Sequence, residues 1–388
     1  MLARIVVCIF AALLVAAAPA GATKPGARRA KVLGTLAKGA HPSRLAIGSD
    51  RTVWYSGVHT VYYGGEWSQD NEGSFIGHLS PGGTPTETTL EPGTFAGQPV
   101  VVPGGDVWYP ESHENAQGDT AFEVVGYSAA GRTQRYAVGS GVTDIDTMVT
   151  MDGNLWFSGW ATVEGAERGV IGRIELGAGA LALFPLEPGC GAGEALAATA
   201  DTIWFGESCP MTSSSSSRPL EGSNLGKIDS SGTITRLALP AGDRPIAVAA
   251  ASDASVWVGM RNDNYRRPSP LVHLDASGKL VGRRVWGASF HGMTVGREGR
   301  LWFSSIVQPT VYDGIASIGP AGHKSRPICV SGKRYCAGGI SELTTGPEGT
   351  LWYAAGPAAS HGIGGGGGSG LMEEENLERA AGFIGRVR

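Results

Sequence analysis

A short run of acidic and histidine residues in this 388-residue chain has the types and spacing that bind cations. Glu111, His113 and Glu114 could offer two carboxylates and an imidazole to one metal ion. The alternative interpretation is that these side chains lie on a loop and are simply solvated. A later carboxylate, Glu207, could join Glu111 as an acid or a base in a lyase or hydrolase.

Aromatic and basic side chains mark two further segments. Tyr62, Tyr63 and Trp67 stand among glycine and polar residues, where exposed rings could form a platform for a sugar or a peptide. Packing of the same rings against the body of the protein is the alternative. Arg266, between Tyr265 and Arg267, could recognise an anionic group, because a guanidinium matches carboxylate and phosphate geometry. A purely surface role is the competing interpretation.

A recurring motif predicts the elements that carry these residues. The segment from Asp152 to Phe157, DGNLWF, indicates a tight hairpin turn followed by a buried strand. This order of a turn followed by an aliphatic residue and tryptophan occurs seven times in all, at intervals of 45 to 54 residues between tryptophans. A period near 50 with strand signals is typical of β-propeller blades. The seven repeated tryptophans are Trp54, Trp108, Trp156, Trp204, Trp257, Trp302 and Trp352.

The repeat predicts an all-β fold, a seven-bladed β-propeller of four-stranded antiparallel blades spanning residues 32–388. The tryptophan strand is the second of each blade, and its ring is expected to fill the layer between blades. The last blade lacks a fourth strand, and residues 32–36 form an apolar segment that could supply it. Pairing of that N-terminal strand with the last blade would close the ring and remove its free edges.

Sequence insertions concentrate between the second and third strands of the blades, for example at residues 56–74 and 110–121. Alternate connections of an up-and-down blade emerge on one side, so these loops should share a face with the starts of the innermost strands. Loop growth on one face commonly marks the working face of a repeat protein. We therefore expect a small molecule, or a peptide or protein, to bind there.

The N-terminus predicts export. Residues 1–22 have the basic start, the apolar run and the small-residue end of a secretory signal peptide, and residues 23–31 form a flexible leader. This apolar run is too short for a stable membrane span and is the only such segment, so the mature chain should be a secreted, periplasmic or cell-envelope exterior protein. The net charge of −4, without a basic block, argues against nucleic acid as a partner. A monomer is expected.

Four cysteines remain after removal of residues 1–22. In an exported protein an even count favours disulfides. Cys190 and Cys209 flank one predicted hairpin almost symmetrically, and Cys329 and Cys336 bracket a short polar loop, so local pairs Cys190–Cys209 and Cys329–Cys336 are predicted. A metal site is the weaker alternative, because no histidine has matching spacing near either pair.

The chain resembles the virginiamycin B lyase (streptogramin B lyase) family over nearly its whole mature length. The resemblance rests on the Gly-x-Leu-Trp-Phe turn, the Ile-Gly-Arg-Ile third strand and the Leu-Pro end of the blade, clearest from Met151 to Leu186. It implies a seven-bladed propeller and a magnesium-dependent opening of a cyclic depsipeptide by C–O elimination. It also implies histidines and glutamates at the mouth of the channel, acting with Mg²⁺ on the substrate.

One of the four family positions is retained. His291, eleven residues before Trp302, matches the first histidine. The Glu-x-His pair of the next blade falls at Ser341, with Glu342 one residue away, and the last glutamate is missing after Trp352. At the same register in the other blades the one further titratable residue is Glu194, two blades from His291.

These observations favour an exported binding module with a degenerate family site at the channel mouth. The alternative is an enzyme, either a magnesium-dependent C–O lyase or a hydrolase of a cyclic ester or lactone. In that case His291 would act with a loop carboxylate such as Glu207 or Glu111. Fold alone does not decide between these functions.

Overall fold

The structure is a computed structural model, and every structural statement concerns the residues that it describes. Among these residues no helix is long and apolar enough to cross a membrane. The described residues are 30–63, 66–114, 120–128, 131–139, 141–209, 223–239, 243–262, 269–286, 288–307, 312–320, 322–325, 328, 340–356 and 381–387.

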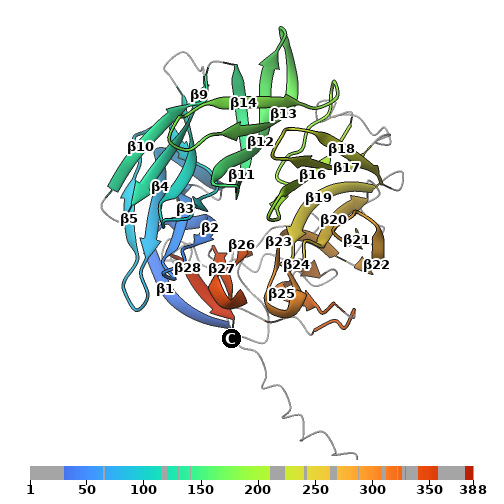
Figure 1. Ribbon diagram of the computed structural model, residues 1–388. Coiled ribbons are helices and arrows are strands. Elements are labelled where there is room, and N and C mark those ends of the chain that lie inside the picture. Colours follow the sequence, from blue (N-terminus) through green and yellow to red (C-terminus); the bar gives the residue numbers. More distant parts are fainter. Residues whose placement is uncertain are drawn as a thin grey trace, which may run out of the picture.

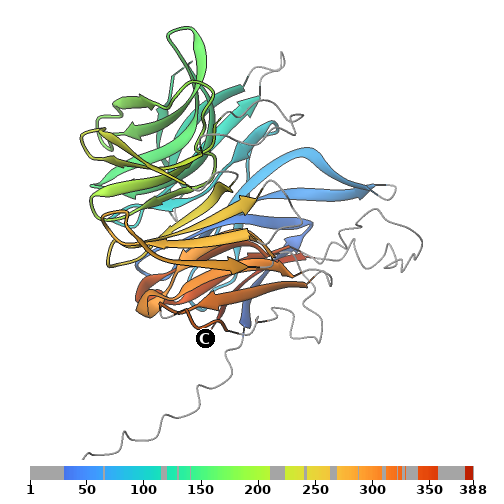
Figure 2. The ribbon, with the colours of Figure 1, turned by 90° about the vertical axis from the view of Figure 1, so that its right-hand side faces the viewer.

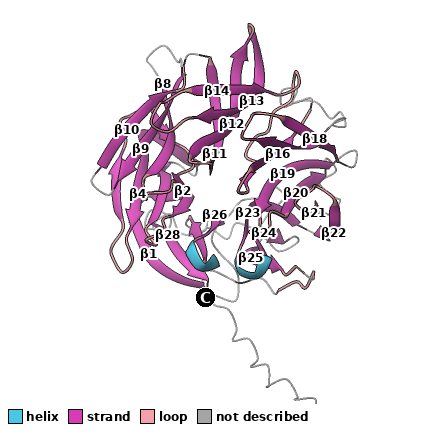
Figure 3. Cartoon of the chain, in the orientation of Figure 1, coloured by secondary structure: helices cyan, strands magenta, loops and turns pink. Residues whose placement is uncertain are grey.

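The described strands form seven antiparallel sheets arranged as blades around a central opening (Figure 1). Strands account for nearly all of the regular structure, as Figure 3 shows. Two short 3-10 turns, η1 (Arg297–Gly299) and η2 (Pro347–Gly349), stand among the described residues in place of the hairpin turn of blades 6 and 7. The predicted fold class is confirmed.

Blades 1 to 4 follow one another along the chain, each running from the innermost strand outward. Blade 1 contains β2 (Ala40–Ile47), β3 (Val53–Tyr63), β4 (Glu66–Leu79) and β5 (Thr86–Thr89). Blade 2 contains β6 (Thr94–Ala96) and β7 (Val100–Val101), both paired with β8 (Val107–Glu114), then β9 (Thr120–Ser128) and β10 (Gly131–Ala137). Blade 3 contains β11 (Val142–Met151), β12 (Asn154–Val163), β13 (Ala166–Ile174) and β14 (Leu181–Pro185). Blade 4 contains β15 (Leu196–Ala198), β16 (Thr202–Glu207), β17 (Asn224–Asp229) and β18 (Ile234–Ala238).

Blades 5 to 7 complete the ring. Blade 5 contains β19 (Asp243–Ala250), β20 (Val256–Asn262), β21 (Ser269–Leu274) and β22 (Leu280–Trp286). Blade 6 contains β23 (Ala288–Val295), β24 (Leu301–Val307) and β25 (Tyr312–Ile318), with single bridges from β25 to Ile328 and Lys324 at its outer edge. Blade 7 contains β26 (Ile340–Thr345), β27 (Leu351–Ala355), β28 (Ala381–Val387) and β1 (Ala30–Lys38).

The N-terminal strand closes the last blade, as predicted. β1 pairs antiparallel with β28 from Ala30, opposite Val387, to Lys38, opposite Ala381. The strand therefore includes the last two residues of the segment expected to be a flexible leader. Because β1 supplies the outer strand of blade 7, β28 has a partner on both sides.

The repeated tryptophans fill the layers between blades, which confirms their predicted role. All seven are buried. Trp156 of blade 3 packs with Ile203 and Phe205 of blade 4, and Trp352 of blade 7 packs with Tyr55 of blade 1. Each blade thus buries one face against the next, and the ring has no single core.

Serine hydroxyls link neighbouring blades close to the inner strands. Ser56 Oγ donates to the carbonyl of Gly97 in the next blade at 2.7 Å, and Ser158 Oγ donates to that of Gly193 at 2.6 Å. Both serines follow their blade's tryptophan by two residues. Ser341 Oγ closes the ring in a related way, donating to the carbonyl of Pro42 at 2.6 Å.

Two of the expected loops between second and third strands are hairpins. β12 and β13 pair without interruption to Val163 opposite Ala166, and the turn residues Glu164 and Gly165 have φ of 53° and 80°. Positive φ at both turn residues matches the twist of a two-residue hairpin, so the ladder extends to its tip. In blade 1 the light-blue β3–β4 hairpin projects beyond the rest of the ring (Figure 2). The expectation of irregular loops was wrong for these blades.

Candidate functional site

An ion-pair bridge spans the central channel. Arg44 on β2 of blade 1 donates from Nη2 to Glu194, just before β15 of blade 4, and from Nη1 to Glu342 on β26 of blade 7, the latter at 3.3 Å. Blades 1 and 7 are neighbours, but blades 1 and 4 are not. A direct contact between inner segments of blades 1 and 4 therefore has to cross the opening seen in Figure 1.

Bulges in the inner strands decide which side chains meet there. The strand register shifts between Pro42 and Arg44 in β2, and again between Ile340 and Glu342 in β26. An extra residue in one strand re-aims the side chains that follow it. The residues of the bridge consequently lie ten positions before their blade's tryptophan, which is one position later than predicted for Arg44 and Glu342 and as predicted for Glu194. The residues at this position are Arg44, Gln98, Asp146, Glu194, Ala247, Gly292 and Glu342.

Asp146 brings an additional carboxylate to the cluster. Its Oδ2 is buried and has no hydrogen-bond partner. Burial raises the pKa of Asp146 to about 7, and the neighbouring charges of Asp144 and Glu194 add to the effect. Burial also raises the pKa of Asp144. We call Arg44, Asp144, Asp146, Glu194 and Glu342 the channel cluster; it holds four carboxyl groups and one guanidinium.

Glu342 is the most buried member, with 9% of its surface exposed. Burial raises its pKa to about 7, against the opposing effects of Arg44 and of the backbone N–H of Leu343, which donates to Oε1 at 3.0 Å. A carboxyl group that changes protonation near neutral pH suits acid–base chemistry as well as cation binding.

His291 lies on the strand next to Glu342. Its backbone is part of β23 and pairs with Ser304, ahead of a bulge at Gly292. A Cβ on Gly292 would stand 3.4 Å from Oε1 of Glu342. The structure describes the backbone of His291 but not its side chain, so its catalytic role stays a prediction.

A cavity of about 440 Å³ occupies the channel. All seven blades contribute residues to its wall. Gln98 belongs both to this wall and to the residues level with the channel cluster, and it accepts a hydrogen bond from Thr147 Oγ1 at 2.5 Å. The other side chains of the wall are mostly aliphatic residues and threonine, such as Leu45, Val149, Leu196, Val248 and Thr345.

Glu111 and His113 form part of blade 2 rather than a loop site. Both lie in β8, and Glu111 is fully buried. Its carboxylate accepts hydrogen bonds from Tyr127 Oη at 2.5 Å and from Arg132 Nη2 at 3.0 Å. His113 Nδ1 lies 3.0 Å from Thr94 Oγ1, and its Nε2 lies 3.5 Å from Glu123. These partners explain the burial of Glu111 without a metal ion.

Glu207 repeats this arrangement in blade 4. Like Glu111, it follows its blade's tryptophan by three residues and is fully buried. Arg236 on the outer strand β18 donates two hydrogen bonds to the Glu207 carboxylate, from Nε to Oε2 at 2.8 Å and from Nη2 to Oε1 at 3.0 Å. Each glutamate therefore links the second strand of its blade to an arginine of the outer strand, in an ion pair whose carboxylate is buried and whose guanidinium is partly exposed.

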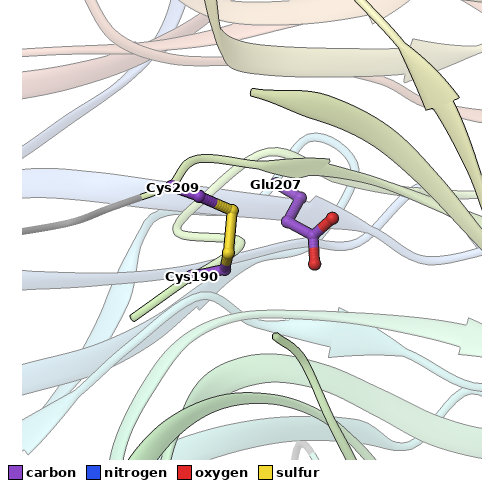
Figure 4. A group of neighbouring side chains, drawn as sticks. All are labelled: Cys190, Glu207 and Cys209. Carbon is purple, nitrogen blue, oxygen red and sulfur yellow. A yellow bond between two sulfur atoms is a disulfide. The ribbon is translucent and has the colours of Figure 1, made fainter. Parts of the chain in front are cut away.

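The predicted disulfide between Cys190 and Cys209 is present, and Glu207 lies beside it (Figure 4). The three side chains have donor atoms within 4.8 Å of one another. Both sulfur atoms are used in the disulfide and Arg236 occupies the carboxylate, so this group is structural rather than a metal site. Cys329, Cys336 and Arg266 lie outside the described residues. For Tyr62 and Trp67 the backbone alone is described; these two residues pair across the β3–β4 hairpin.

The described residues do not fit the magnesium site that the family resemblance implies. No three acidic or histidine donors of the channel, within the described part of the chain, come within 4.8 Å of one another. A guanidinium, that of Arg44, lies between Glu194 and Glu342, where a cation bound by those carboxylates would stand. Cation repulsion at that position disfavours a divalent ion.

Glu194 and Glu342 were named from the sequence, but Arg44, Asp144 and Asp146 were missed because the inner strands were aligned on His291. Alignment at eleven residues before tryptophan finds Ser43, Ile145 and Ser341, whereas the next position finds Arg44, Asp146 and Glu342. Charged residues at that next position in four of the seven blades were the available signal. Sequence spacing alone did not reveal the bulges that re-aim them.

Fold and channel together define a seven-bladed β-propeller with a charged centre. No protein-family model matches the chain, and no curated protein matches it in sequence. Among solved structures it is similar to a catalytically inactive variant of virginiamycin B lyase from Staphylococcus aureus with quinupristin. That similarity has a TM-score of 0.61 at 17% identity and covers 92% of this chain and 99% of the lyase.

Two further structures share the fold at lower similarity. The β-propeller domain of the trilobed protease from Pyrococcus furiosus matches with a TM-score of 0.53 at 10% identity, over 82% of this chain and 92% of that domain. The extracellular domain of a putative one-component system from B. thetaiotaomicron matches with a TM-score of 0.54 at 14% identity, over 84% of this chain and 39% of that one. At these identities the comparisons establish the propeller architecture alone, so any activity has to be inferred from the residues of the site.

Proposed function

We propose that this chain is an exported β-propeller that binds a small molecule through a protonated amine at the channel cluster. The observation that carries the proposal is the buried Oδ2 of Asp146, which has no hydrogen-bond partner. Buried carboxylates without a partner are costly, and an ammonium group beside Asp146 would supply both a hydrogen bond and a compensating charge.

The charge balance of the cluster supports a cationic ligand. Arg44 contacts two of the four carboxyl groups, but its single positive charge balances only one negative charge, and Asp146 remains beside Asp144 and Glu194. The contact of Arg44 with Glu194 and Glu342 already shows carboxylates of the channel cluster binding a nitrogen cation. The aliphatic and threonine side chains of the adjoining 440 Å³ cavity would accept the rest of such a ligand.

Export is supported by three features of the chain. Residues 1–22 have the pattern of a signal peptide, and the Cys190–Cys209 disulfide suits an oxidising compartment. The absence of a membrane-spanning helix among the described residues is compatible with it. The family's elimination site is replaced, in this proposal, by a binding site, since three of its four positions differ.

Calorimetry tests the binding proposal. The purified mature protein is titrated at pH 8 with benzylamine, cadaverine and agmatine, and with benzyl alcohol as the uncharged counterpart. At least one amine is expected to bind and benzyl alcohol is not. Asp146→Asn should weaken binding of the amine by about tenfold, because the substitution removes a charge-assisted hydrogen bond. Glu167→Gln, an exposed carboxylate of the same blade, should bind as the parent. Failure of all three amines, or full binding by Asp146→Asn, rejects the proposal.

One observation favours a second function, an acid–base lyase or hydrolase of a cyclic ester or lactone. Glu342, with its pKa near 7, could exchange a proton with a substrate in the channel. The protein is assayed with and without Mg²⁺ against cyclic depsipeptides and lactones. Turnover by the parent protein that is lost in both Glu342→Gln and His291→Ala would establish the enzymatic function. Absence of turnover with every compound of the panel would reject it.

A further inference from the structure

A groove runs along the junction where β1 closes the ring, away from the channel cluster. It has a volume of about 430 Å³ and lies between blades 7 and 1. Val53, Leu79 and Trp352 form its apolar part, and Lys31, Arg51 and Arg386 supply its charges. None of the described residues that line it is acidic. The groove therefore combines an apolar surface with a wholly cationic set of side chains.

Two of the three cations are forced together by the strand register. Lys31 on β1 stands directly opposite Arg386 on β28, and Arg386 stands opposite Trp352 on β27. Residues opposite each other in antiparallel strands project from the same face, where like charges destabilise the pairing. The Nε of Arg386 is in addition buried and without a hydrogen-bond partner. An anion bound between the two side chains would relieve both problems.

Blade 3 shows how the same register is used where no ligand is needed. Arg173 stands opposite Trp156 there, lies 5.5 Å from the centre of its ring, and donates to the carbonyl of Ser230 at 2.7 Å. Phe184 of the outer strand stacks on the same tryptophan and fills the space.

Blade 7 lacks this filling. Phe184 pairs with Ile171 in blade 3, whereas the corresponding Ile384 of blade 7 pairs with Gly34. A Cβ on Gly34 would stand 2.9 Å from Pro85 Cγ and 3.1 Å from Leu79 Cδ2, so side chains from blade 1 take the place of the aromatic ring and the groove lies beside them. The glycine at this position, next to the unsatisfied Nε of Arg386, distinguishes blade 7 from blade 3.

We infer that this groove binds a small amphipathic anion, a carboxylate or phosphate group carried on an apolar body. Arg386 and Lys31 would hold the anionic group, since a guanidinium offers paired donors to carboxylate and phosphate oxygens. The apolar body would lie against Val32 and Leu33 of β1, together with the small exposed parts of Leu79 and Trp352. This site is independent of the amine site in the channel. Its occupant would touch β1 and blade 1 together and so stabilise the closed ring.

The test measures binding and thermal unfolding with defined probes. The mature protein is titrated with phenyl phosphate, benzoate and inorganic phosphate, with benzyl alcohol as the uncharged control. Phenyl phosphate or benzoate is expected to bind and to raise the unfolding temperature, and the tighter of the two identifies the anionic group. Inorganic phosphate should bind more weakly than phenyl phosphate because it has no apolar body.

Matched variants locate the site. The double variant Lys31→Gln and Arg386→Gln should weaken the aromatic anion by at least about tenfold. Arg173→Gln, at the same register of blade 3, should leave binding unchanged. Arg386→Lys keeps the charge but loses the planar guanidinium, so its affinity for the anion should lie between that of the double variant and that of Arg173→Gln. The inference fails if neither aromatic anion binds, or if the double variant, folded by circular dichroism, binds like the parent.

Discussion

The guanidinium of Arg44 on blade 1 contacts the carboxylate of Glu194 on blade 4, across the central channel. Most contacts between blades in this ring join neighbours, through tryptophan layers and serine hydroxyls. The Arg44–Glu194 contact instead links opposite walls and closes the channel at one level. Residues that line the channel cavity, such as Leu45 and Leu196, closely follow members of this cluster along the inner segments, so the cluster adjoins the cavity.

The first prediction concerns the stability of that bridge. Arg44→Met should lower the free energy of unfolding by about 2–3 kcal/mol at pH 8, because the buried carboxylate of Glu342 loses its counter-charge. The loss should be smaller at pH 5, where Glu342 is protonated. Urea unfolding at the two pH values measures both effects. Glu194→Gln serves as the control and should cost less than about 1 kcal/mol, since the Glu194 side chain is 59% exposed. Equal losses in the two variants would contradict the role given to Glu342.

The second prediction concerns pH. The pKa of Glu342 is raised by burial from 4.5 to about 7, so the folded protein binds more protons than the unfolded chain between these values. The free energy of unfolding should therefore fall as the pH rises from about 5 to about 8, by about 3 kcal/mol for this group. Asp146, with its pKa also near 7, acts in the same direction. Urea unfolding of Glu342→Gln should show a markedly flatter pH dependence; an unchanged slope would place the proton uptake elsewhere.

The third prediction concerns the Glu207–Arg236 ion pair in blade 4. Glu207→Ala should cost about 1–3 kcal/mol, because two charge-assisted hydrogen bonds are lost while Arg236, whose side chain is 30% exposed, keeps some access to solvent. Adding Arg236→Met should recover part of that loss, as removal of both charges leaves no unpaired group. Glu187→Gln is the matched control. Its carboxylate also faces Arg236, at 3.7 Å, but is 65% exposed, so denaturant unfolding should barely change.

The fourth prediction concerns the cysteines. Non-reducing peptide mapping should recover Cys190 linked to Cys209 and, from the sequence pattern, Cys329 linked to Cys336. Replacement of both Cys190 and Cys209 by serine should lower the free energy of unfolding by about 2–4 kcal/mol, mainly by freeing the unfolded chain. Free thiols at Cys329 and Cys336 in protein purified without a reducing agent would refute the second pairing and leave the first untouched.

The architecture could be predicted from the sequence because the blades repeat. Each tryptophan occupies one register, and the leftover segment at residues 32–36 had an evident partner in the incomplete last blade. The DGNLWF segment also revealed its own turn, with φ of 50° at Asp152 and 71° at Gly153. Periodicity carries this information even when individual blades have little sequence in common.

The site could be predicted only in part. Glu194 was recognised as a channel residue, but its partner Arg44 and the carboxylate of Asp146 were not, because strand bulges displace them by one position. Glu111 and Glu207 were expected on loops. Their arginines come from outer strands more than twenty residues later, and such pairing follows from tertiary structure rather than local pattern.

The pairing of β1 with β28 also sets the order of assembly. Ala30 and Val387 are among the first and last described residues, yet they are neighbours in one sheet. Blades 1 to 6 can form from segments that lie close together in the chain, whereas blade 7 has to wait for the final strand to meet the first. Such a non-local contact is slow to form and leaves edges exposed until it does. Ring closure is therefore expected to be the last and slowest step of folding, and the point at which aggregation competes most strongly.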